Sequence, residues 1–195
     1  MLHPPRRLFI GLIPERSVQL QIQRHCRDWT WPEQARPTRF GRYHIALHDL
    51  GDMGLGPEQT LRKALRQLPM QAMELQLGEP QLWQHGIAVL KLGEHQGLRA
   101  LHKRIGEVLP TAGLKPDGAE FDAHVTLARD AMGASPPREH PFIRWHVRDF
   151  LLVWSRLPPE VKPAQYDILE RFGVNDRSVF QAASGQSGEQ FPLFG

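Results

Sequence analysis

An internal repeat with an offset of 80 residues is the feature that most constrains the fold. Residues 8–12 (LFIGL) align without a gap on residues 88–92 (AVLKL). The amphipathic pattern that begins near Val18 aligns on one that begins near Leu98, and each half then continues into a second apolar segment. The repeat indicates a duplicated strand–helix–strand unit, so we expect two related lobes that pack together.

The same periodicities predict further strands and the limits of the domain. The glycine-rich segment 51–59 is expected to form a turn that places Pro57 at the first position of a helix. From about residue 175 the composition becomes polar and rich in glycine. We expect one bilobal domain over residues 1–174 and a flexible C-terminal tail over residues 175–195. Strands are predicted at residues 7–12, 43–47, 73–78, 80–84, 86–93, 121–129, 142–157 and 165–174.

The composition is typical of a globular protein from a reducing compartment. The 195 residues include 24 Lys and Arg against 21 Asp and Glu, a net charge of +3, which permits a polyanionic partner without demanding one. The single cysteine, Cys26, excludes an internal disulfide bond. The apolar run after Arg7 is too short for a signal peptide, and no run approaches the roughly twenty residues of a membrane span. We therefore expect a cytoplasmic protein with no membrane partner.

One histidine lies at the same position in each half of the repeat, His44 in the first and His124 in the second. Side chains two residues apart on a strand share a face, so His124 and Thr126 should point the same way. In the first half, His44, Ala46 and His48 should share a face. Two such strands that face each other would place two imidazoles on opposite sides of one groove.

A pair of imidazoles on opposite sides of a substrate suits phosphoester chemistry. One imidazole removes a proton from water or a hydroxyl group, and the other protonates the leaving oxygen. Both steps are possible near neutral pH because the pKa of histidine is about 6.5. The hydroxyl of Thr126 can donate a hydrogen bond to phosphate. Arg129 has an odd offset from His124, so its guanidinium can grip phosphate only if the strand ends or bends at Ala128.

The two histidine segments resemble a known family. HIAL (44–47) and HVTLAR (124–129) are similar to the paired His-x-(Thr/Ser) motifs of the 2H phosphoesterase superfamily. The most similar branch is the RNA 2′,3′-cyclic phosphodiesterases, also called the 2′-5′ RNA ligase family. Segments 7–14 and 166–172 support the resemblance, which covers roughly residues 6–173.

The resemblance implies a fold, an activity and residue roles. The fold is α+β, bilobal and pseudo-twofold, with two antiparallel sheets and outer helices around a central groove. The activity is hydrolysis of the 2′,3′-cyclic phosphate of RNA ends or nucleotides to a 2′-phosphate, with no metal or other cofactor. His44 would protonate the 3′ leaving oxygen and His124 would activate water. Thr126 and Arg129 would hold the phosphate, and a monomer is the expected state.

The first motif departs from the family pattern at two positions. The family has Thr or Ser where this chain has Ala46, and a small residue where it has His48. Losing a hydrogen bond to a charged group costs about 1.5–3 kcal/mol, whereas losing an acid–base histidine costs about 10²–10⁴ in rate. These magnitudes predict a weakened or re-specialised enzyme, and Ala46→Thr should raise its activity. His48 lies too far along the strand to replace the hydroxyl, and we expect it at the rim or exposed.

Other functions stay open from the sequence alone. One alternative is a catalytically weakened relative that binds RNA, helped by Arg36, Arg39 and Arg42 before the first motif. A second is 2′-5′ RNA ligase activity. A zinc site at His44 and His48, which have i, i+4 spacing, is disfavoured because the segment lacks a helical pattern.

Overall fold

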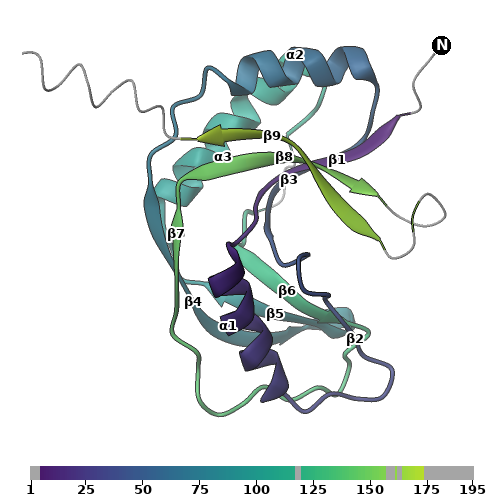
Figure 1. Ribbon diagram of the computed structural model, residues 1–195, viewed down its shortest axis with the longest axis vertical. Coiled ribbons are helices and arrows are strands. Elements are labelled where there is room, and N and C mark those ends of the chain that lie inside the picture. Colours follow the sequence, from purple (N-terminus) through teal and green to yellow (C-terminus); the bar gives the residue numbers. More distant parts are fainter. Residues whose placement is uncertain (1–4, 117–119, 157–160, 162–163, 174–195) are drawn as a thin grey trace, which may run out of the picture.

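The computed structural model describes residues 5–116, 120–156, 161 and 164–173 and contains two antiparallel sheets with packed helices (Figure 1). The predicted tail, residues 175–195, lies outside the described residues. The helices are α1 (Arg16–Arg27), α2 (Leu55–Leu65) and α3 (Gln96–Val108), with 3₁₀ turns η1 (Gln84–Gly86) and η2 (Leu109–Ala112). The strands are β1 (Arg6–Leu12), β2 (Arg36–Pro37), β3 (Ile45–Met53), β4 (Met73–Trp83), β5 (Ile87–Leu92), β6 (His124–Arg129), β7 (Ile143–Val147), β8 (Asp149–Arg156) and β9 (Gln165–Gly173). The expected α+β class is confirmed.

The pairing of the strands repeats between the two sheets. One sheet has the order β3-β1-β8-β9, and the other has the order β2-β6-β5-β4-β7. β1 pairs with β3 as β5 pairs with β6, both antiparallel. α1 begins at Arg16 and α3 at Gln96, which is the offset of 80 residues seen in the sequence. Each sheet forms one lobe, and a groove lies between the lobes.

The helices cross over between the lobes. α1 follows β1 of the four-stranded sheet but contacts β7 of the five-stranded sheet. α3 follows β5 of the five-stranded sheet but contacts β3 of the other sheet. In Figure 1, α1 lies over the five-stranded sheet, whereas α2 lies near β9, whose Glu170 pairs with Arg62 and Arg66. Because each sheet is covered by a helix from the other half, both lobes share one hydrophobic core.

Three local predictions are wrong. The strand predicted over residues 142–157 is two strands, β7 of the five-stranded sheet and β8 of the four-stranded sheet. The glycine-rich segment continues β3 to Met53, because the chain stays paired with β1 as far as Arg6. α2 then begins at Leu55, so Pro57 is its third residue. The two strands predicted around Pro80 form one strand, β4. The pairing of β4 with β7 ends at Leu77, so Pro80 has a sheet neighbour on one side, where a missing N–H is tolerated.

A β-bulge at the same position in each half decides which side chains face the groove. The extra residue is Leu47 in β3 and Leu127 in β6, 80 positions later. A bulge interrupts the alternation of faces along a strand. Leu47 and His48 are therefore both buried, as are Leu127 and Ala128. Each side chain after the bulge therefore points to the face of the sheet opposite to the one it would occupy in a regular strand.

Candidate active site

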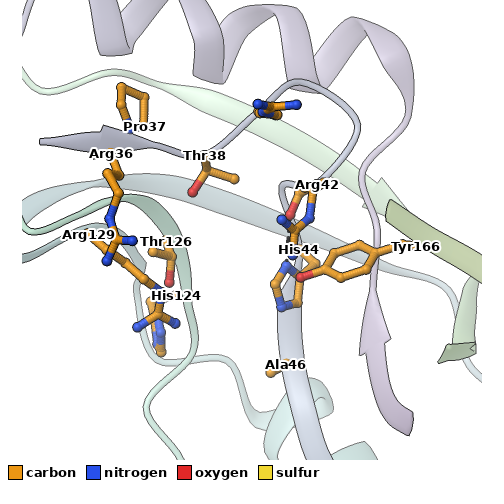
Figure 2. Close-up of a pocket in the computed structure, with 11 residues that line it drawn as sticks. Arg36, Pro37, Thr38, Arg42, His44, Ala46, His124, Thr126, Arg129 and Tyr166 are labelled. Carbon is orange, nitrogen blue, oxygen red and sulfur yellow. Dashed lines mark hydrogen bonds between the residues drawn. The ribbon is translucent and has the colours of Figure 1, made fainter. Parts of the chain in front are cut away.

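A cavity of about 410 Å³ lies between the lobes, where β3 and β6 approach each other (Figure 2). Five residues of the two histidine motifs line it, namely His44, Ala46, His124, Thr126 and Arg129. The other lining residues are Arg36, Pro37, Thr38, Arg39, Arg42 and Tyr166. The structure thus brings the two histidine motifs to one cavity, and of the predicted site residues only His48 does not line it.

The backbone holds the two histidines in the same way. The Nδ1 atom of His44 lies 2.9 Å from the carbonyl oxygen of Arg42. The Nδ1 atom of His124 lies 2.7 Å from the carbonyl oxygen of Asp122. In each case the carbonyl two residues earlier accepts the Nδ1 proton, which fixes the tautomer. The Nε2 atom of each ring is then the nitrogen that can give or take a proton.

Aromatic side chains pack against both imidazoles. The ring of His44 lies 4.9 Å from that of Phe9 and 5.2 Å from that of Tyr166, centroid to centroid. The ring of His124 lies 4.4 Å from that of Trp83. These contacts restrict the rotation of both rings, so hydrogen bonding and packing together position each Nε2 atom.

Burial and neighbouring positive charges act on the pKa of His44. Burial is the largest effect and lowers this pKa from its ordinary value. The hydrogen bond to the Arg42 carbonyl opposes burial, whereas the charges of Arg42, His124 and Arg129 lower the pKa further. At neutral pH these effects favour the neutral imidazole of His44. An anion bound between the arginines would favour its protonated form.

The lining of the cavity is strongly cationic. It includes the four arginines Arg36, Arg39, Arg42 and Arg129, and no Asp or Glu is among the described residues that line it. Arg36 forms a salt bridge with Asp130, which offsets one of these charges. A cavity with this balance of charge attracts anions.

The bulge in β6 explains how Arg129 reaches the cavity. The alternation of a regular strand would turn a side chain five residues after His124 away from it. Because Leu127 is an extra residue in the strand, the side chain of Arg129 points to the same face as those of His124 and Thr126, and it lines the same cavity. From the sequence, Arg129 could face the site only if the strand ended or bent at Ala128, and the bulge interrupts the strand next to that residue.

The prediction that His48 is exposed or at the rim is wrong. Its side chain is 4% exposed, because the bulge at Leu47 turns it towards α3. The Nε2 atom of His48 lies 2.9 Å from the carbonyl oxygen of His102, and the two rings stack with centroids 4.2 Å apart. His48 therefore belongs to the packing between β3 and α3.

No role was predicted for three residues that line the cavity, Pro37, Thr38 and Tyr166. Tyr166 begins the segment 166–172 that supports the family resemblance, so a signal for it existed. Thr38 lies in a proline-flanked loop and carried no signal. Its backbone N–H donates to the carbonyl of Leu127 at 2.7 Å, which attaches this loop to β6.

Neither a metal cluster nor a reactive thiol is found in the described part of the chain. No three His, Cys, Asp or Glu side chains there are grouped so that they could hold a metal ion. Burial raises the pKa of the Cys26 thiol to about 11, so this thiol is protonated near neutral pH and is a poor nucleophile. Within these same residues, no helix has the length and apolar character needed to cross a bilayer.

Comparison with known proteins identifies the fold. No protein-family model and no curated protein sequence matches the chain. The structure of Escherichia coli LigT with 3′-AMP superposes with a TM-score of 0.79 at 22% identity, over 87% of this chain and 98% of that chain. The chain has the 2H phosphoesterase fold. The protein TT0787 of Thermus thermophilus matches with a TM-score of 0.67 at 21% identity, over 86% of this chain and 97% of that chain.

A further solved structure, described as a phosphoesterase, has a TM-score of 0.79 at 22% identity over 87% of this chain and 98% of that chain. The 2H phosphoesterase fold inferred from the paired histidine motifs is therefore confirmed. At this level of identity the likeness establishes the arrangement of the lobes. The chemistry has to be argued from the residues that line the groove of this 2H fold.

Proposed function

We propose that this protein hydrolyses 2′,3′-cyclic phosphates of RNA ends or nucleotides to 2′-phosphates. The observation that carries the proposal is the position of His44 and His124 at one cavity, each with Nδ1 bound by a backbone carbonyl. Displacement at phosphorus needs proton removal on one side and proton delivery on the other. Two imidazoles with available Nε2 atoms can perform both transfers.

The proposed reaction has one proton transfer for each histidine. His124 Nε2 takes a proton from water, and the water oxygen forms a bond to phosphorus. The bond between phosphorus and the 3′ oxygen breaks, and the protonated Nε2 of His44 gives its proton to that oxygen. The products are a 2′-phosphate and a 3′-hydroxyl. Thr126 and Arg129 bind the non-bridging oxygens, where negative charge increases during the reaction.

The electrostatics of His44 fit the role of an acid that is charged when substrate binds. Its lowered pKa favours the neutral ring in the free protein. A cyclic phosphate carries a negative charge, which would offset the positive charges of Arg42 and Arg129 and raise this pKa. Substrate binding would therefore help to load the proton that the leaving oxygen needs.

The class of substrate is supported by the cavity and by one structural neighbour. The cationic lining favours a phosphate group. A protein of the same fold, Escherichia coli LigT, has been solved with 3′-AMP, a nucleotide with phosphate on its ribose. With a 5′-hydroxyl in place of water, the same two histidines would form a 2′-5′ linkage. Ligation is therefore an alternative outcome at the same site.

A second candidate function is RNA binding with weakened catalysis. Ala46 favours it, because this position of the cavity offers no hydroxyl group to a phosphate. Both histidines and Thr126 favour catalysis, since simple binding of RNA does not require two imidazoles with matched hydrogen bonds.

Product analysis separates these functions. The protein is incubated with EDTA and an oligonucleotide that ends in a 2′,3′-cyclic phosphate, with a 5′-hydroxyl oligonucleotide present or absent. We expect a 2′-phosphate product that is lost in His44→Ala and in His124→Ala. His146→Ala, at an exposed position of β7, is the matched control and should remain active. Salt-sensitive RNA binding without turnover would contradict hydrolysis and favour the second candidate.

A further inference from the structure

The two halves of the cavity differ in what they offer to a phosphate. The strand of the second half presents Thr126 and Arg129. The residues at the same positions of the first half are Ala46 and Asp49, and Asp49 is engaged by Arg7 at 3.0 Å. The first strand therefore has neither the hydroxyl nor the guanidinium of the second. A phosphate bound only by residues of β6 would receive hydrogen bonds from that side of the groove alone.

Arg42 lies on the side that lacks these donors. It lines the cavity, and its guanidinium carbon is 4.6 Å from the centroid of the Tyr166 ring. Figure 2 shows Arg42 beside His44 and Tyr166, across the cavity from Thr126 and Arg129. Its Nε atom is buried and has no hydrogen-bond partner among the described residues. None of the ion pairs formed within the described ranges involves Arg42.

The backbone around Arg42 is held in place. Its N–H donates to the carbonyl of Arg39 at 3.0 Å, and its own carbonyl accepts the proton of His44 Nδ1. The preceding residue, Gly41, has a φ of 87° and donates to the Oε1 atom of the buried Gln19 at 2.7 Å. Glycine adopts this left-handed conformation without strain. The backbone of Arg42 is therefore positioned before a ligand binds, which reduces the entropic cost of binding.

The matching position in the second half shows what is particular about Arg42. Asp122 also offers its carbonyl to a catalytic histidine, but its carboxylate is paired with Lys91 at 3.1 Å. The charge at this position is thus balanced by an ion pair in the second half. In the first half, the guanidinium of Arg42 instead packs against the aromatic ring of Tyr166. A partly buried guanidinium in this state is stabilised by an anion that accepts two parallel hydrogen bonds.

We propose that Arg42 binds the substrate phosphate from the side of the groove where Ala46 replaces a hydroxyl residue. A phosphate would then lie between Arg42 and Arg129, with one histidine on each side. The proposal rests on the proposed function for the identity of the ligand as a cyclic phosphate. The loss of the hydroxyl at Ala46 is, on this view, offset by a charged donor from the preceding loop.

Phosphate binding and turnover are measured on the same set of variants. Inorganic phosphate is titrated by NMR into the unmodified protein, Arg42→Gln, Ala46→Thr and the double variant, and each is assayed with a 2′,3′-cyclic nucleotide. We expect Arg42→Gln to weaken phosphate binding about tenfold to hundredfold. Ala46→Thr should improve binding by a larger factor in the Arg42→Gln background than in the unmodified protein. Arg144→Gln, which removes an arginine 5.1 Å from the Phe142 ring centroid and outside the cavity, should leave binding unchanged.

The design separates this proposal from the proposed function. Turnover that persists while Arg42→Gln leaves phosphate binding unchanged would overturn the role of Arg42 alone. Phosphate binding that depends on Arg42 without any turnover would support this role and contradict hydrolysis. If Ala46→Thr changes phosphate binding by the same factor in both backgrounds, Arg42 does not compensate for the missing hydroxyl at Ala46. If Arg42→Gln does not fold, Arg42→Lys is used, because lysine keeps the charge but lacks the planar guanidinium. Arg42→Lys should bind phosphate more weakly than the unmodified protein does, and equal binding would overturn the proposal.

Discussion

The two halves of the groove share a backbone plan and differ in the side chains that it carries. Each half has a histidine held by the carbonyl two residues earlier, followed by a bulge three residues after the histidine. Only the second half presents a hydroxyl and a guanidinium from its strand, at Thr126 and Arg129. The devices that orient the imidazoles are thus common to both halves, whereas the candidate phosphate ligands differ.

The largest expected effect comes from the feature that the halves share. His44→Ala and His124→Ala should each lower kcat about 10²–10⁴-fold, because each removes one proton transfer. If both act in the same step, the double variant should lose little more than the worse single variant. Single-turnover rates on a 2′,3′-cyclic nucleotide measure this. Losses that multiply would indicate two separate steps.

The next effect tests the side chains that differ. Thr126→Ala makes the second half resemble the first at this position. It should lower kcat/KM about tenfold to hundredfold, since one hydrogen bond to a charged group is lost. Thr126→Ser keeps the hydroxyl and should retain most activity. Equal rates for Thr126→Ala and the unmodified protein would show that this hydroxyl does not touch the phosphate.

His48 and Ala128 follow the bulges in the two halves, and both are buried. His48→Ala should lower the free energy of unfolding by about 2 kcal/mol, because it removes a hydrogen bond and leaves a cavity beside α3. The activity of the folded fraction should change little. Urea unfolding followed by circular dichroism measures the stability. A large loss of kcat without a loss of stability would contradict this packing role and indicate that His48 acts in the active site.

The smallest effect is a shift in the titration of His44. Its pKa should lie below the ordinary value of about 6.5 in the free protein, because burial and the nearby positive charges disfavour the imidazolium. Inorganic phosphate should raise this pKa, and Arg42→Gln should raise it without phosphate. The NMR signals of the imidazole, followed between about pH 4 and 9, which brackets the ordinary pKa of histidine, report both shifts. A pKa at or above the ordinary value in the free protein would contradict this electrostatic account.

The duplicated strand–helix–strand unit could be predicted from the sequence, because buried residues recur at regular intervals along strands and helices. The offset of 80 residues and the apolar faces of α1 and α3 can be counted along the chain. The facing of His48 could not be predicted, because a bulge adds one residue without changing the residue types. In the second half, the consecutive apolar residues Leu127 and Ala128 hinted at such an interruption. In the first half, a histidine occupies the second of these positions and gives no hint.

The remaining parts of the cavity depend on tertiary structure. Tyr166 comes from the last described strand, and its contact with Arg42 joins residues that are 124 positions apart. Arg42 was visible as one of three arginines before the first motif. Which of them meets an aromatic ring in the groove depends on the turn at Gly41 and on the pairing of β8 with β9. Neither leaves a pattern in the residues around Arg42.

The most direct test of the two-histidine account uses a 2′,3′-cyclic phosphate in which sulfur replaces the 3′ bridging oxygen. A thiolate leaves without protonation, so the general acid becomes dispensable while the general base does not. We predict that His44→Ala recovers most of its lost rate on this substrate, whereas His124→Ala remains as impaired as on the oxygen substrate. Equal impairment of both variants on the sulfur substrate would contradict the assignment of one acid and one base to the two halves of the groove.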